Sequence, residues 1–270
     1  MLASLEILRP SNGIMAAAFF VIGAAMAGVS LVPIPLTVLT GMLVVFMVSG
    51  AGMAINDYYD FEIDKVNRPL RVLPSGRMKP RTAYYYASLL FVAACAIAYT
   101  LNIYMFGFAI FNSIVSCIYA RYLKKTPYGH FAVSWLVASV FLFASLLTGV
   151  SDLMLVLFGM AFSINTAREI AKAIEDILGD RKYGVNSLPV TIGRLKANKV
   201  IYAFTAVGVL LTPIPYLMNA VGAYYVPVAV LADALAIYAA YKVALHPGKS
   251  QRMMKLAMLA AIIAFLAGLV

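Results

Sequence analysis

The sequence predicts an all-α membrane protein that crosses the bilayer many times. Apolar residues make up 63% of the 270 residues and charged residues only 12%, which is about half of the charged fraction usual in soluble domains. The apolar residues form runs of roughly 20, the length that a helix needs to cross the hydrocarbon core. We therefore expect residues 1–270 to form a single domain built from membrane-spanning helices.

Nine segments of the chain meet this length requirement and define the elements that we expect. They are residues 13–31, 36–55, 82–101, 103–120, 131–150, 152–174, 199–218, 222–244 and 254–270. Very tight turns separate 82–101 from 103–120 and 131–150 from 152–174. The sequence thus predicts a polytopic protein with nine transmembrane helices.

The basic residues predict the orientation of these helices. All 21 Lys and Arg residues fall on one side of the nine-helix arrangement, and the alternate loops near 32–35, 102, 151 and 219–221 contain none. Positive charge collects on the cytoplasmic face of a membrane protein, so we expect a cytoplasmic N-terminus and a C-terminus outside. The net charge of +10 follows from this topology. It indicates anionic lipid head groups as neighbours, and no nucleic acid.

A first acidic cluster follows the expected second helix, in NDYYDFEIDKVNRP at residues 56–69. At about 100° per residue, Asp57, Asp60 and Asp64 fall within one arc of roughly 60° on a helix, with Asn56 beside it. Like charges at this spacing repel one another, so a cation is needed to stabilise them. Oxygen ligands of this kind suit Mg²⁺ held jointly by carboxylates and substrate phosphates.

A second acidic cluster follows the expected sixth helix, in NTAREIAKAIEDILGD at residues 165–180. The same periodicity places five side chains on one narrow stripe: Asn165, Glu169, Lys172, Asp176 and Asp180. Gly179 is a position where the helix can end before Asp180. A single acidic helix end is usually a solvated face. Two such clusters on the same membrane side, each followed by basic loops, predict a diphosphate held between them through metal ions.

At these residues the chain resembles the UbiA superfamily of intramembrane prenyltransferases. The family's first motif, N-D-x-x-D-x-x-x-D, is matched at residues 56–64, and NRPLRVLPSG at 67–76 is similar to the segment that follows it. The second motif, D-x-x-x-D, is matched at residues 176–180. The segments LRPSNG at 8–13, YARYLKK at 119–125 and NSLPVTIG at 186–193 are also similar to family segments. The resemblance implies nine transmembrane helices around a central cavity with a cytoplasmic cap.

Within this family, REIAKAIED at 168–176 is similar to the R-E-I-x-K-D-x-E-D version of the archaeal digeranylgeranylglyceryl phosphate synthase branch. Some quinone and tocopherol-type members share that version, and Ala173 stands where it often has Asp. The resemblance implies Mg²⁺-dependent transfer of a geranylgeranyl group from an allylic diphosphate to geranylgeranylglyceryl phosphate in archaeal ether-lipid biosynthesis. Within the family, the alternative is an aromatic prenyltransferase of quinone biosynthesis that takes an acceptor of the 4-hydroxybenzoate or naphthoate type.

This reaction implies roles for individual residues. Bound Mg²⁺ would neutralise the charge that develops on the leaving pyrophosphate, and the expected metal ligands are Asp57, Asp60, Asp64, Asp176 and Asp180. These five aspartates, Lys172 and Tyr119 are the expected catalytic residues, since the tyrosine ring can stabilise an allylic cation. The expected substrate-binding residues are Arg68, Lys79 and Lys124 for the diphosphate, Arg9 and Arg71 for an acceptor phosphate, and Asn12, Asn56 and Asn165 as polar groups of the site.

Two other classes of membrane protein are alternatives to a prenyltransferase. A CDP-alcohol phosphatidyltransferase also uses carboxylates and metal, but its D-G-x-x-A-R signature is missing, because Phe61 and Glu62 follow Asp60. A transporter more often places charge near the bilayer midplane, where Asp233 is the sole acid and has no assigned partner. The sequence leaves the oligomeric state open.

Overall fold

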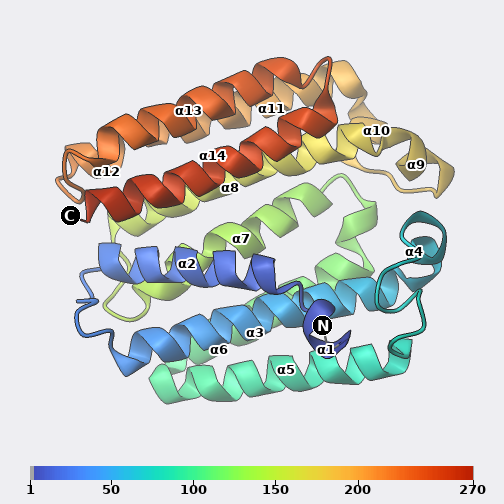
Figure 1. Ribbon diagram of the computed structural model, residues 1–270, viewed down its shortest axis with the longest axis horizontal. Coiled ribbons are helices and arrows are strands. Elements are labelled where there is room, and N and C mark those ends of the chain that lie inside the picture. Colours follow the sequence, from blue (N-terminus) through green and yellow to red (C-terminus); the bar gives the residue numbers. More distant parts are fainter. Residues whose placement is uncertain (1–2, 270) are drawn as a thin grey trace. The chain divides into compact units, whose positions relative to one another are not determined.

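The computed structural model describes residues 3–269. In that range all secondary structure elements are helices, fourteen α-helices and one short 3-10 helix, which confirms the predicted all-α class (Figure 1). The helices form two compact units. The first runs to Arg121 and includes Leu146–Gly149, and the second consists of Tyr122–Ser145 and the chain from Val150 onward.

The first unit is organised around a long helix that carries the first acidic motif. Its helices are α1 (Ala3–Glu6), α2 (Pro10–Met26), α3 (Leu36–Tyr59), α4 (Phe61–Asn67), α5 (Pro80–Leu101) and α6 (Ile103–Arg121). Helix α3 packs against α2, α5 and α6, and Figure 1 shows α3 running between α2 and α5. Proline occupies the first position of α2 and α5, where its missing N–H costs no hydrogen bond.

The second unit is organised in the same way around α8, whose end directly precedes the second acidic motif. Its helices are η1 (Leu123–Lys125), α7 (Gly129–Ser145), α8 (Asp152–Glu175), α9 (Ile177–Lys182), α10 (Leu188–Ile192), α11 (Arg194–Leu211), α12 (Ile214–Leu217), α13 (Tyr225–Lys242) and α14 (Pro247–Gly268). Helix α8 packs against α7, α11 and α14, and α13 packs along α14 (Figure 1).

Within the described residues, seven segments are long and apolar enough to cross a membrane: α3, α5, α6, α8, α11 with α12, α13 and α14. The other two expected spans coincide with α2 and α7, which have 17 residues each. At 1.5 Å per residue such a helix is about 26 Å long, slightly short of a bilayer core. Helix α2 stops at Met26 and not at residue 31, because Gly28 adopts a φ of +86° that a right-handed helix cannot contain.

Two details at the end of α11 differ from expectation. The expected span 199–218 is interrupted after Leu211, where Pro213 and Pro215 remove two helical N–H donors. Asp233 of α13, which had no assigned partner, accepts a hydrogen bond of 2.9 Å from the hydroxyl of Thr212 at this interruption. The side chain therefore ties α13 to the end of α11.

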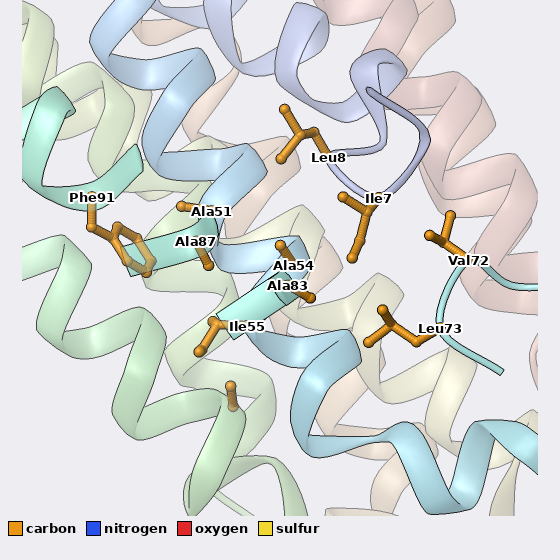
Figure 2. Packing of buried hydrophobic residues seen from close by; sticks show 11 residues of the cluster. Ile7, Leu8, Ala51, Ala54, Ile55, Val72, Leu73, Ala83, Ala87 and Phe91 are labelled. Carbon is orange, nitrogen blue, oxygen red and sulfur yellow. The ribbon is translucent and has the colours of Figure 1, made fainter. Parts of the chain in front are cut away.

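A buried apolar cluster of the first unit holds two loops against the acidic end of α3. Figure 2 shows Ile7 and Leu8, between α1 and α2, and Val72 and Leu73, after α4, packed around α3 and α5. Small α3 and α5 residues, such as Ala54 and Ala83, let the helices approach closely. The cluster fixes the backbone on one side of Arg9 and of Arg71, because each arginine is adjacent to a buried residue.

Candidate active site

The three aspartates of the first motif are buried at the end of α3. Asp57 lies in the last turn of α3, Asp60 at the junction with α4, and Asp64 in α4, and each is no more than 7% exposed. The backbone keeps helical hydrogen bonds through the junction, from Asp60 N to Asn56 O at 3.0 Å and from Asp64 N to Asp60 O at 2.8 Å. The helical spacing of the motif therefore continues across the break between the two helices.

Two arginines, one far from the motif in the sequence and one shortly after it, pair with Asp57 and Asp64. Arg71 Nη1 lies 2.5 Å from Asp64 Oδ2 and 3.3 Å from Asp57 Oδ1, so one guanidinium joins both side chains. Arg9 forms an ion pair with the same Asp57 oxygen. Arg9 adopts a left-handed conformation with φ 50° at the start of α2, which turns the chain between the buried Leu8 and the helix. The structure thus gathers at Asp57 two residues that the sequence had assigned to an acceptor phosphate.

Asn56 completes the polar end of α3. Its amide Nδ2 donates a 3.0 Å hydrogen bond to Asp60 Oδ2. Among the described residues its buried Oδ1 has no hydrogen-bond partner. A buried acceptor without a partner is costly, so this oxygen is suited to contact a bound ligand.

The remaining predicted residues of the first unit are less buried than the three aspartates. Arg68 and Lys79 are exposed, and Tyr119 of α6 is half-buried. Asn12 of α2 is half-buried, with Nδ2 at 4.0 Å from the Met53 sulfur. Glu62, in the same segment, is exposed and accepts a 2.9 Å hydrogen bond from Lys65.

The second motif begins where α8 ends. Asp176 separates α8 from α9, and Asp180 lies within α9 with its N–H 2.9 Å from the Asp176 carbonyl. Gly179 does not end the helix, because α9 continues to Lys182. Burial raises the pKa of Asp180, and the negative charge of Asp176 adds to this effect.

Three neighbouring side chains lower the pKa of Asp180. The largest effect comes from the hydroxyl of Ser187, which donates a 2.6 Å hydrogen bond to Asp180 Oδ2. Lys124 and Lys172 lower the same pKa through their positive charge. The structure therefore brings Lys124, Lys172 and the two aspartates into one electrostatic environment. Ser187 was missed as a site residue, although it lies in the NSLPVTIG segment that the sequence singled out.

The predicted stripe along α8 also contains residues deeper in the helix. Asn165 is buried, and its Nδ2 donates a 3.2 Å hydrogen bond to Ser134 of α7, which links the two helices. Glu169 pairs with its neighbour Arg168 and interacts electrostatically with Lys172 and His130. The last third of α8 thus carries a network of charged side chains.

The carboxylates fit Mg²⁺ in pairs and not as a preformed cage. Among residues 3–269 no group of three or more His, Cys, Asp or Glu side chains is arranged to hold a metal ion. Mg²⁺ commonly takes one or two carboxylates and fills its remaining positions with water and substrate phosphate. Asp57 and Asp64, whose oxygens converge on one Arg71 nitrogen, are such a pair. Asp176 and Asp180, one helical turn apart, offer a second pair.

Comparisons with known proteins identify the family of this chain. Residues 16–267 match the sequence model of the UbiA prenyltransferase family. It is 41% identical to digeranylgeranylglyceryl phosphate synthase of Methanosarcina mazei, with 84% of this chain and 80% of the relative covered. The enzyme of the same name from Methanopyrus kandleri is 38% identical, with both chains fully covered.

Solved structures give the same result at the level of the fold. A structure of a digeranylgeranylglyceryl phosphate synthase is 31% identical, covers 99% of this chain and 97% of its own, and superposes with a TM-score of 0.81. A UbiA homolog from Archaeoglobus fulgidus bound to GPP and Mg²⁺ shares the fold with a TM-score of 0.73 at 19% identity, with 99% of both chains covered. The chain belongs to the UbiA prenyltransferase family.

Proposed function

We propose that this protein transfers a geranylgeranyl group from an allylic diphosphate to geranylgeranylglyceryl phosphate, in a reaction that depends on Mg²⁺. The observation that carries the proposal is the convergence of Asp57 and Asp64 on Arg71 at the end of a helix long enough to span a membrane. The relatives that share 38% and 41% identity and carry the name of this synthase support the choice of acceptor.

The reaction exchanges one carbon–oxygen bond for another. The bond between the allylic carbon and the diphosphate oxygen breaks, and its electron pair leaves with pyrophosphate. The free hydroxyl oxygen of the glycerol acceptor bonds to that carbon to form an ether, and the hydroxyl proton is released. When bound, Mg²⁺ neutralises the charge that grows on the leaving pyrophosphate. An apolar site within the membrane protects the allylic cation from water.

The residues of both motifs have defined roles in this proposal. Asp57, Asp60 and Asp64 of the first motif, and Asp176 and Asp180 of the second, bind the metal ions. Two observations support these roles. Asp57 and Asp64 lie as a pair at Arg71, and the buried Asn56 Oδ1 has no hydrogen-bond partner among the described residues. The basic residues that contact diphosphate oxygens are Arg68, Lys79, Lys124 and Lys172. Tyr119 faces the allylic cation, and Asn12 lines the site.

The same proposal includes the membrane topology. Residues 1–270 form one prenyltransferase domain that crosses the cell membrane nine times, and the family match over residues 16–267 supports the single domain. The short helices α2 and α7 count as spans, because 17 residues is at the lower limit for a transmembrane helix. The N-terminus and the active site are cytoplasmic, and the C-terminus is outside, as the distribution of Lys and Arg predicts.

One experiment tests both chemistry and acceptor. Purified protein is incubated with Mg²⁺, geranylgeranyl diphosphate and either geranylgeranylglyceryl phosphate or 4-hydroxybenzoate, and the extracted products are identified by mass. We expect product only with the glycerol phosphate acceptor. A product only with the aromatic acid would assign the protein to quinone biosynthesis instead.

Variants of the two motifs test the metal assignment in the same assay. We expect Asp60→Ala and Asp176→Ala each to abolish turnover. Glu62→Ala is the matched control, because Glu62 belongs to the same segment but is exposed and pairs with Lys65. Near-normal turnover in either aspartate variant would contradict the assignment for that motif.

A further inference from the structure

The last third of α8 contains a cation, Arg168, that its surroundings do not fully satisfy. Arg168 Nη1 pairs with Glu169, and the two side chains are only 22% and 15% exposed. Among residues 3–269, the buried Nε of Arg168 has no hydrogen-bond partner. Adjacent residues on a helix do not normally face each other, so this pair forms only because both side chains lean toward the same side. Glu169 therefore holds the Arg168 guanidinium in place, while the Nε donor of that guanidinium has no acceptor among the described residues.

The acidic neighbours of this network do not account for the whole guanidinium. Glu169 interacts with Arg168, Lys172 and His130, and Lys172 also acts on Asp180 of the second motif. Glu169 pairs with Nη1 of Arg168, whereas the buried Nε has no hydrogen-bond partner among the described residues. A buried donor without a partner is costly, so this edge of the guanidinium is suited to receive an anion.

We propose that Arg168, oriented by Glu169, binds the phosphate of the acceptor lipid. This inference rests on the proposed function, in which the acceptor is a phosphate monoester. Arginine suits the role because its planar donors match phosphate oxygens in pairs. The residue is thus a specificity determinant for a phosphorylated glycerol acceptor over a neutral or aromatic one.

The position of Arg168 along α8 separates it from the diphosphate. Arg168 precedes Asp176 by eight residues, which corresponds to about 12 Å along the helix axis. An acceptor attacks the allylic carbon from the side opposite the leaving pyrophosphate, so its head group lies beyond that carbon. Two covalent bonds join the allylic carbon to the nearer phosphorus of the diphosphate. The attacking oxygen lies roughly 3 Å from that carbon. At most five further bonds lead from this oxygen to the phosphorus of the acceptor. Sites spaced by about two helical turns match this separation.

The two arginines first considered for the acceptor phosphate have other partners. Arg9 and Arg71 both contact Asp57, and Arg71 also contacts Asp64. Their donors are directed at the carboxylates of the first motif. Arg168 differs from them because its buried Nε has no hydrogen-bond partner among residues 3–269.

Steady-state kinetics of Arg168→Gln, Arg168→Lys and the unaltered protein test this role. Each is measured against geranylgeranylglyceryl phosphate, against the dephosphorylated alcohol and against geranylgeranyl diphosphate. We expect Arg168→Gln to raise the KM for the phosphate acceptor at least 10-fold, with a smaller increase in Arg168→Lys. The KM for geranylgeranyl diphosphate and the rate with the alcohol should stay within 2-fold of the unaltered protein. Arg252→Gln, which changes an exposed arginine at the start of α14, serves as control.

The outcomes separate this inference from the function on which it rests. An unaltered protein that makes no product with the glycerol phosphate acceptor refutes the proposed function. Normal transfer by that protein together with an unchanged acceptor KM in Arg168→Gln refutes only the role of Arg168. A rise in the KM for the diphosphate, or equal losses with the phosphorylated and dephosphorylated acceptors, also refutes it. Failure of both Arg168 variants to fold would assign the residue a structural role.

Discussion

The Ser187 hydroxyl donates a hydrogen bond of 2.6 Å to Asp180 Oδ2, and this contact fixes one carboxylate of the second motif. Ser187 is buried and immediately precedes α10, so the start of that helix determines where the hydroxyl lies. Groups that hold a metal ligand in this way influence metal affinity without touching the metal.

Ser187→Ala should weaken Mg²⁺ binding while leaving the fold intact. The expected effect is a rise of about 10-fold or more in the Mg²⁺ concentration that gives half-maximal activity, because Asp180 loses its orientation and its pKa rises further. The measurement is the Mg²⁺ dependence of turnover, with Ser187→Thr as the variant that keeps the hydroxyl. An unchanged Mg²⁺ dependence in Ser187→Ala would show that this hydrogen bond does not support the metal site.

Removal of divalent metal should stop the reaction reversibly. A chelator should abolish product formation and added Mg²⁺ should restore it, since pyrophosphate leaves poorly when its charge is not neutralised. Binding can be followed separately with Mn²⁺, whose free form is detected by electron paramagnetic resonance. Asp64→Asn should reduce Mn²⁺ binding and Glu62→Gln should not, because Asp64 lies at Arg71 together with Asp57, whereas Glu62 is exposed and pairs with Lys65. Equal Mn²⁺ affinity in the two variants would contradict the assignment of Asp64.

The pair Glu6–Arg77 should make the attachment of α1 dependent on pH. Arg77 Nη2 donates to Glu6 Oε1 at 2.8 Å, and this hydrogen bond lowers the pKa of Glu6 below its ordinary 4.5. A lowered carboxyl pKa gives stability that is present above about pH 4.5 and is lost as the pH falls through the folded-state value. Both side chains are at the surface, so salt should reduce the effect.

Hydrogen exchange at the amides of Ile7 and Arg9, which donate to the α1 carbonyls of Ala3 and Glu6 at 3.1 Å, tests this expectation as a function of pH. The native protein should exchange more slowly than Glu6→Gln at neutral pH, and the difference should disappear in acid. High salt should diminish the difference at neutral pH. A difference of the same size at all pH values would mean that the Glu6 charge does not hold α1.

Asn165 and Ser134 should behave as a pair that stabilises the contact between α7 and α8. The 3.2 Å hydrogen bond between them lies in a buried region, and interhelical hydrogen bonds in membrane proteins contribute about 0.6 kcal/mol on average. A double-mutant cycle with Asn165→Ala and Ser134→Ala should give a coupling free energy of that order in unfolding measurements. If Asn165→Ala instead raises a substrate KM and Ser134→Ala does not, Asn165 contacts substrate as first predicted.

The sequence by itself determined the features that depend on composition and local periodicity. Long apolar runs predicted spanning helices, and seven of the nine coincide with helices that can cross a membrane. Helical spacing predicted that Asp57, Asp60 and Asp64 lie on successive turns. The spacing held even where Asp60 separates α3 from α4, because each backbone hydrogen bond depends only on residues four apart.

The tertiary structure alone decided which distant side chains meet these carboxylates. Arg9 is 48 residues from Asp57, and Ser187 reaches Asp180 from the start of another helix. No local pattern encodes the Arg9 contact, because it depends on how the buried Leu8 fixes the turn before α2. The partner of Asp233 was missed for the same reason: Thr212 is 21 residues away, at an interruption that the prolines of the α11–α12 segment produce. Helical periodicity acts over one or two turns, whereas packing joins residues that the sequence separates by many.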